Sequence, residues 1–121
     1  MNEIDFAHQL FDAARNGETE FVVSAVDQGV PVNLTDPKGN TLLMLAAYYG
    51  HAPLTAALIE RGADLDRMND RQQTPVAGAV FKKHTDVIRV LIAHGADLDA
   101  GIPTARAAAQ MFGVDLTVLE G

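Results

Sequence analysis

Histidines and paired aspartates are the residues of this chain whose types could bind a metal or transfer protons. The histidines are His8, His51, His84 and His94, and a cluster of imidazoles can hold a transition metal. His51 and His84, however, are 33 residues apart, and several other residue types repeat at that spacing. A histidine that recurs with a repeat is expected to serve the structure of each copy, and His8 and His94 do not occupy matching positions. We therefore predict no metal site.

The acidic pairs Asp64/Asp66 and Asp97/Asp99 would suit calcium binding or acid–base catalysis. They recur with the same spacing and follow a glycine at a turn, where aspartate side chains usually bond local backbone. The ligand spacing of a calcium-binding EF-hand loop is absent. Ser24 is the only serine, it lies in a helical pattern, and no nucleophile motif surrounds it. We predict no catalytic residues, no cofactor and no enzymatic activity.

The composition predicts one compact domain that binds neither nucleic acid nor membrane. Of the 121 residues, 48% are hydrophobic, which is enough for a continuous core. The net charge of −7 disfavours a general nucleic-acid binder, because such proteins need basic surface. No segment approaches the roughly 20 apolar residues that span a bilayer, and the acidic N-terminus does not resemble a secretory signal. We therefore expect a cytoplasmic protein, and we expect it to be a monomer. Disulfides are excluded because the chain has no cysteine.

An internal repeat is the dominant feature of the sequence. Three segments end alike, and their glycines Gly29, Gly62 and Gly95 are 33 residues apart in both steps. Two further pairs of residues keep this spacing: Thr41 with Thr74, and Gly17 with Gly50. Chance would not keep several residue types in phase over three units, so the chain is built from repeated structural units.

The repeated motif resembles that of the ankyrin-repeat family. Residues 41–51, with the sequence TLLMLAAYYGH, are similar to the family's T-P-L-H-x-A-A-x-x-G-H helix, and residues 74–79, TPVAGA, form a second copy. Residues 62–66 and 95–99, both GADLD, match the family's G-A-D-V-N ending. The resemblance covers nearly the whole chain. The short length of the chain is similar to that of small single-domain bacterial members of the family.

The resemblance implies an all-α ankyrin-repeat solenoid of about four helix–turn–helix units with projecting loops, or fingers. We expect a single domain over residues 1–121, with units at about 6–35, 36–68, 69–100 and 101–121. Apolar residues at helical spacing mark the second helix of the inner units. No unit can bury its apolar face alone, so stacking of the units must form the core.

Helix ends can be placed from single residues. Thr41 and Thr74 should cap the first helices of two units, because a threonine hydroxyl accepts a hydrogen bond from a free backbone N–H. Gly62 should end a second helix in the left-handed conformation. Alanine at that position should then cost on the order of 1 kcal/mol.

The third unit departs from the second at several positions. Gln72 and Lys83 stand where the second unit has glycines, and Gly78 stands where it has a leucine. The leucine would be a core residue, so its loss removes a side chain from the core. We expect the third unit to be the loosest of the stack.

The resemblance implies that a partner protein binds the concave side, through the finger tips and the exposed ends of the first helices. The helix-end residues are Arg15, Tyr48, Tyr49, Phe81, Lys82, Met111 and Phe112. The finger-tip residues are Lys38, Asn40, Arg71 and Gln73. Three successive units carry a large aromatic at the helix end, and aromatics are enriched in interface hot spots. Tyr48 or Tyr49 should be exposed, whereas Phe81 and Phe112 either join this aromatic stripe or pack on the neighbouring repeat.

We therefore expect a protein–protein interaction module, acting as an adaptor or as an inhibitor of one partner protein. The alternative is a chaperone-like accessory protein that supports an enzyme or its cofactor loading, as some bacterial ankyrin proteins are thought to do. The chain has no Cys-Pro haem motif, and His8 and His94 are the only histidines without an expected structural role.

Overall fold

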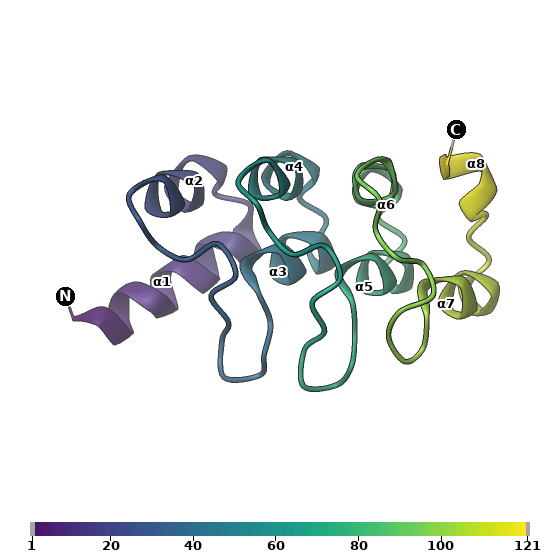
Figure 1. Ribbon diagram of the computed structural model, residues 1–121, viewed down its shortest axis with the longest axis horizontal. Helices are drawn as coiled ribbons and strands as arrows, with labels where there is room; N and C mark the ends of the chain where they lie inside the picture. Colours follow the sequence, from purple (N-terminus) through teal and green to yellow (C-terminus); the bar gives the residue numbers. More distant parts are fainter. Residues whose placement is uncertain (1, 121) are drawn as a thin grey trace.

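Helices arranged in antiparallel pairs make up the stack. The computed structural model describes residues 2–120. Its helices are α1 (Glu3–Asn16), α2 (Thr19–Asp27), α3 (Leu42–Tyr48), α4 (Ala52–Glu60), α5 (Pro75–Phe81), α6 (Thr85–Ala93), α7 (Ala105–Phe112) and α8 (Leu116–Glu120). Figure 1 shows the pairs side by side in chain order, with the odd-numbered helices in one layer and the even-numbered helices in the other. The predicted all-α solenoid is confirmed.

The fingers are the loops that project from the stack between successive helix pairs (Figure 1). We call residues 36–40 the first finger and residues 69–73 the second finger; the third lies between α6 and α7. Backbone hydrogen bonds join them edge to edge. The Asp70 amide donates to the Lys38 carbonyl at 3.0 Å, and the Ile102 amide donates to the Gln72 carbonyl at 3.0 Å. The fingers therefore keep a fixed register along the stack.

The core lies between the two helix layers. The odd-numbered helices, which we call the inner helices, contribute most of its side chains, and the even-numbered helices are the outer helices. Residues 42–47 of α3 and residues 75–80 of α5 are all buried. The outer helices bury one face only; in α6 this face is Val87, Ile88 and Leu91. Because α3 and α5 are enclosed by helices on each side and by the outer layer, only their ends reach the surface. The inner layer of the fold thus reaches the surface at its helix ends, next to the fingers.

The first helices begin at buried threonines. The Thr41 hydroxyl oxygen accepts a hydrogen bond from the Met44 amide at 3.0 Å, and that of Thr74 accepts one from the Ala77 amide at 3.2 Å. Both threonines are almost completely buried. The predicted caps are confirmed, and they satisfy backbone donors that would otherwise be stranded in the core.

The recurring histidines connect each unit to the one before it. Nε2 of His51 lies 2.6 Å from the Arg15 carbonyl oxygen, and Nε2 of His84 lies 3.0 Å from the Tyr48 carbonyl oxygen. Each bond runs from the start of an outer helix to the end of the preceding inner helix. The structural role predicted for both histidines is confirmed, and the bonds hold in place the helix ends that carry Arg15 and Tyr48.

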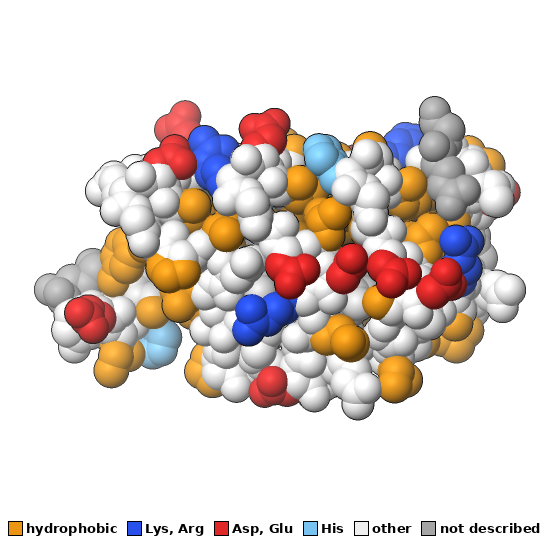
Figure 2. Space-filling view, in the orientation of Figure 1, with side chains coloured by type: hydrophobic (Ala, Val, Ile, Leu, Met, Phe, Trp, Pro, Cys, Tyr) orange, Lys and Arg blue, Asp and Glu red, His pale blue; other side chains and the backbone are white. Residues whose placement is uncertain are grey.

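The paired aspartates form a ladder of hydrogen bonds between successive turns. The Asp64 amide donates to the Asn33 side chain at 2.9 Å, and the Asp97 amide donates to the Asp66 side chain at 2.8 Å. Within each turn, the first aspartate also accepts a bond from the amide of the second, at 3.1 Å for Asp66 and 2.9 Å for Asp99. Figure 2 shows acidic side chains in a row across the stack. Their predicted structural role is confirmed.

The third unit carries backbone strain but no hole at Gly78. A Cβ atom on Gly78 would lie 3.0 Å from Cε of Met44 and 3.3 Å from Cδ2 of Tyr48, so these side chains fill the space. Gln72 and Lys83 have φ angles of 62° and 61°, which L-residues adopt only at a cost of about 1–2 kcal/mol. The expected looseness of this unit stays a prediction, now resting on strain rather than on a missing side chain.

Replacing Lys83 with glycine should stabilise the fold by roughly 0.5–1 kcal/mol, because the relieved strain exceeds the extra entropy of glycine in the unfolded chain. Lys82→Gly is the matched control, since Lys82 has a φ of −89° and should lose stability by a similar amount. Urea unfolding followed by circular dichroism measures both free energies. Equal destabilisation by the two changes would contradict the strain argument.

Two glycine-to-alanine changes separate backbone strain from steric overlap. Gly17 and Gly62 both have positive φ angles, of 73° and 87°. A Cβ on Gly62 would meet nothing within 4 Å, whereas one on Gly17 would overlap the His51 ring. Gly62→Ala should cost about 1 kcal/mol of unfolding free energy, and Gly17→Ala about 1–3 kcal/mol more, because the ring must move. Denaturant titration of both variants tests this, and equal losses would show that the His51 contact is soft.

Candidate functional site

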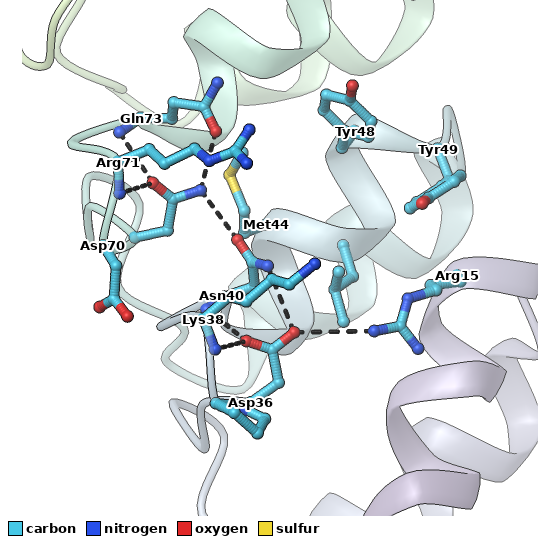
Figure 3. A pocket seen from close by; sticks show the side chains of 13 residues that line it. Arg15, Asp36, Lys38, Asn40, Met44, Tyr48, Tyr49, Asp70, Arg71 and Gln73 are labelled. Carbon is cyan, nitrogen blue, oxygen red and sulfur yellow. Dashed lines mark hydrogen bonds and ion pairs between the residues drawn. The ribbon is translucent and has the colours of Figure 1, made fainter.

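A groove of about 380 Å³ lies between the first two fingers and the end of α3; we call it the finger groove. The fingers contribute Asp36, Pro37, Lys38, Asn40, Asn69, Asp70, Arg71 and Gln73, and the helices contribute Arg15, Met44, Leu45, Tyr48 and the adjoining Tyr49. Figure 3 shows the Arg15 and Arg71 side chains on opposite sides of this groove. Cations and amides therefore surround a floor formed by α3.

Asp36 fixes the backbone of the first finger. Its Oδ1 accepts hydrogen bonds from the amides of Lys38 and Asn40, both at 2.9 Å. Its Oδ2 accepts a bond from Nδ2 of Asn40 at 3.2 Å and lies 3.7 Å from the Arg15 guanidinium. The residue is only 8% exposed, so its charge is taken up inside the finger and by Arg15 (Figure 3).

Asn69 does the same in the second finger, 33 residues later. Its Oδ1 accepts bonds from the amides of Arg71 and Gln73, both at 3.0 Å. Its Nδ2 donates to Oδ1 of Asn40 and to Oε1 of Gln73, both at 2.9 Å. A carboxylate could not make these last two bonds, because it has no donor. Side chains of the finger interior thus hold both finger backbones, and the side chains of Lys38 and Arg71 do not take part in that network.

The end of α3 places two tyrosines beside the groove. Their rings pack edge to face, with centroids 5.3 Å apart. Tyr49 is 47% exposed, whereas Tyr48 is half-buried and carries the Lys82 amino group 5.3 Å above its ring centroid, within the range of a cation–π contact. Tyr49 is therefore the exposed member of the pair.

The ends of α5 and α7 carry an apolar surface next to this site. Phe81 is 51% and Met111 65% exposed. Phe112 is half-buried, and its ring packs edge to face on Phe81 with centroids 5.0 Å apart. The two alternatives for the phenylalanines thus separate: Phe81 joins the exposed surface, and Phe112 packs on the neighbouring unit. We call the exposed side chains Tyr49, Phe81 and Met111 the apolar stripe.

The structure brings seven of the eleven predicted binding residues into the lining of the finger groove. These are Arg15, Lys38, Asn40, Tyr48, Tyr49, Arg71 and Gln73. The other four, Phe81, Lys82, Met111 and Phe112, lie at the ends of the next two inner helices. Sequence reasoning missed Asp36 and Asn69. The signal for them was their 33-residue spacing, together with the tendency of Asp and Asn side chains to bond backbone two residues later.

The side chains that line the finger groove are mainly cationic, amide and aromatic, with two carboxylates, Asp36 and Asp70. Among residues 2–120, no group of three or more histidine and acidic side chains is placed to hold a metal ion. The helices of this part of the chain are all too short or too polar to cross a membrane. What the site offers a ligand is cationic, amide and aromatic groups on a fixed backbone.

Comparison with known proteins identifies similar sequences. A family model described as ankyrin repeats in three copies matches residues 10–101. A curated ankyrin repeat protein of Pseudomonas aeruginosa is 50% identical over 52 residues, which are 43% of this chain. The matched segment spans only 30% of the length of that relative, so the likeness concerns the repeats and not the whole relative.

Asn69→Ala should destabilise the protein by about 1–3 kcal/mol, because four hydrogen bonds of the second finger lose their partner and the groove loses one side. Arg71→Ala is the control on the same finger: its side chain holds no finger backbone, and a change within about 0.5 kcal/mol is expected. Urea unfolding measures stability, and hydrogen exchange at residues 70–73 reports the finger itself. Unchanged exchange in Asn69→Ala would refute this role.

Proposed function

The chain belongs to the ankyrin-repeat family, and we propose that it holds a partner protein against its concave side, as an adaptor or as an inhibitor of that partner. Ankyrin repeats are generally protein–protein interaction modules, and members of the family are typically not enzymes. The proposal concerns this stack of repeats, and it assigns binding to the finger groove and the apolar stripe together.

The observation that carries the proposal is the exposure of large apolar side chains at the ends of three successive inner helices. Tyr49, Phe81 and Met111 are each about half or more exposed, although residues 42–47 of α3 and residues 75–80 of α5 are buried. Packing within the stack does not require apolar side chains at these exposed places. A partner that covered these three side chains would remove their apolar surface from water, which favours binding.

The fixed backbone of the fingers supports the same conclusion. Asp36 and Asn69 hold the two fingers with side-chain bonds of 2.9–3.2 Å. A surface that is already ordered loses little conformational entropy when a partner binds. The finger side chains can therefore contribute their contacts to affinity without first ordering the loops.

Tyr49→Ala and Phe81→Ala should each weaken binding of the partner by roughly 2 kcal/mol, because both truncate an aromatic in the centre of the interface. The partner is identified by affinity capture from the native source, comparing wild type with the variants, and the dissociation constants are then measured by surface plasmon resonance. Phe21→Ala is the control, since Phe21 is also exposed but lies on the outer helix α2.

Folding must be followed in parallel, because a loss of stability would also reduce binding. We expect urea unfolding midpoints of Tyr49→Ala and Phe81→Ala close to that of wild type. Partner binding that survives both changes, or that is lost equally in Phe21→Ala, would contradict a binding role for the concave side.

A further inference from the structure

Two of the four ion pairs among residues 2–120 involve no residue of the finger groove. Arg61 bonds Asp27 at 2.7 Å and Arg106 bonds Asp99 at 2.9 Å. The hydrogen bond from Arg61 lowers the pKa of the Asp27 carboxyl, with a smaller contribution from its charge. These arginines therefore have their carboxylate partner within the chain: Arg61 links the ends of α4 and α2, and Arg106 links α7 to the turn before it.

The basic side chains near the finger groove are arranged differently. Within residues 2–120, Lys38, Arg71 and Lys82 form no ion pair, and all three are exposed. Arg15 is paired with Asp12 at 2.8 Å and lies 3.7 Å from Asp36. The groove thus keeps cations without a carboxylate partner.

The charge of the groove is opposite to that of the chain. Its lining contains Arg15, Lys38 and Arg71 against Asp36 and Asp70, which is three positive minus two negative charges, or +1. The whole chain carries −7, so the remainder carries −8. The negative charge of Asp36 is also buried and faces Arg15. Lys82, held over Tyr48 at the rim, adds a further positive charge to this region.

We infer that the finger groove binds an acidic segment of the partner protein, whose aspartate and glutamate side chains pair with Arg71, Lys38 and Lys82. This inference rests on the proposed function and specifies the chemistry of the partner. The planar guanidinium of Arg71 can take a carboxylate with two parallel hydrogen bonds. Opposite charge at an interface mainly sets specificity and the rate of association.

A protein segment fits this groove better than a nucleic acid. A long polyanion would have to approach the −8 charge of the remaining surface as well as the groove, and nucleic-acid binding depends on displacing counterions with extended basic surface. A short acidic segment contacts only the local positive region. The neighbouring apolar stripe can then hold apolar residues that adjoin the acidic ones.

The test selects ligands from a display library of random twelve-residue peptides on the wild-type chain. Selected peptides should be enriched in aspartate and glutamate over the starting library. Fluorescence anisotropy then measures their affinities for Arg71→Glu and Lys38→Glu, each of which should bind about tenfold more weakly or worse, corresponding to about 1.4 kcal/mol. Arg89→Glu changes the net charge equally from the exposed side of α6 and should change affinity less than twofold.

Several outcomes would overturn the inference that the finger groove binds an acidic segment. They are a failure to select any peptide, selected peptides without acidic enrichment, affinities that Arg71→Glu and Lys38→Glu leave unchanged, and tighter binding of labelled single-stranded DNA than of the peptides. Circular dichroism and urea unfolding of each variant show that a loss of affinity is not a loss of fold.

The proposed function can survive the failure of this inference. If binding of the captured native partner requires Tyr49 and Phe81 but Arg71→Glu binds it as tightly as wild type, the proposed concave interface is supported and the inference of an acidic segment is wrong. If the partner depends on neither aromatic, the proposed function itself is wrong, whatever the peptides show.

Discussion

The burial of short inner helices between their neighbours is the constraint on which the rest of the structure depends. α3 and α5 have seven residues each, and isolated helices of this length are not stable in water. They exist because the preceding unit, the following unit and the outer layer all cover them. A side chain in the middle of such a helix is committed to the core, so an inner helix reaches the surface only at its end, beside the fingers.

Polar residues that could do chemistry are used to set the register of this stack. His51 and His84 bond carbonyls of the preceding unit, and Asp66 bonds the backbone of the following one. These bonds compensate backbone groups that would otherwise be poorly satisfied between units. The histidine bonds also act on the finger groove. The carbonyls that they hold belong to Arg15 and Tyr48, two residues that line the groove.

The fold could be predicted from the sequence because its signals are local and periodic: a cap such as Thr41 needs only its own helix, the 33-residue phase marks the units, and the resemblance of their motif to the ankyrin repeat implies how they stack. The outcome at Gly78 could not, because it depends on how Met44 and Tyr48 of another unit fill the space. Phe81 and Phe112 remained alternatives for the same reason. The bonds of Asp36 and Asn69 required the path of the finger backbone, although the spacing of the two residues hinted at them.

A regular contact at the inner-helix ends gives the concave side a direction. Lys82 packs over the ring of Tyr48, and Phe112 packs on the ring of Phe81 one unit later. In both steps, a side chain at the end of one inner helix packs on an aromatic ring at the end of the preceding inner helix. The packed side chain is cationic in the first step and aromatic in the second. Along the same direction, the exposed surface changes from the cationic side chains of the finger groove to Phe81 and Met111. An extended segment bound as proposed therefore meets unlike chemistry at its two ends. Only one orientation places its acidic residues at the first two fingers and its apolar residues at α5 and α7.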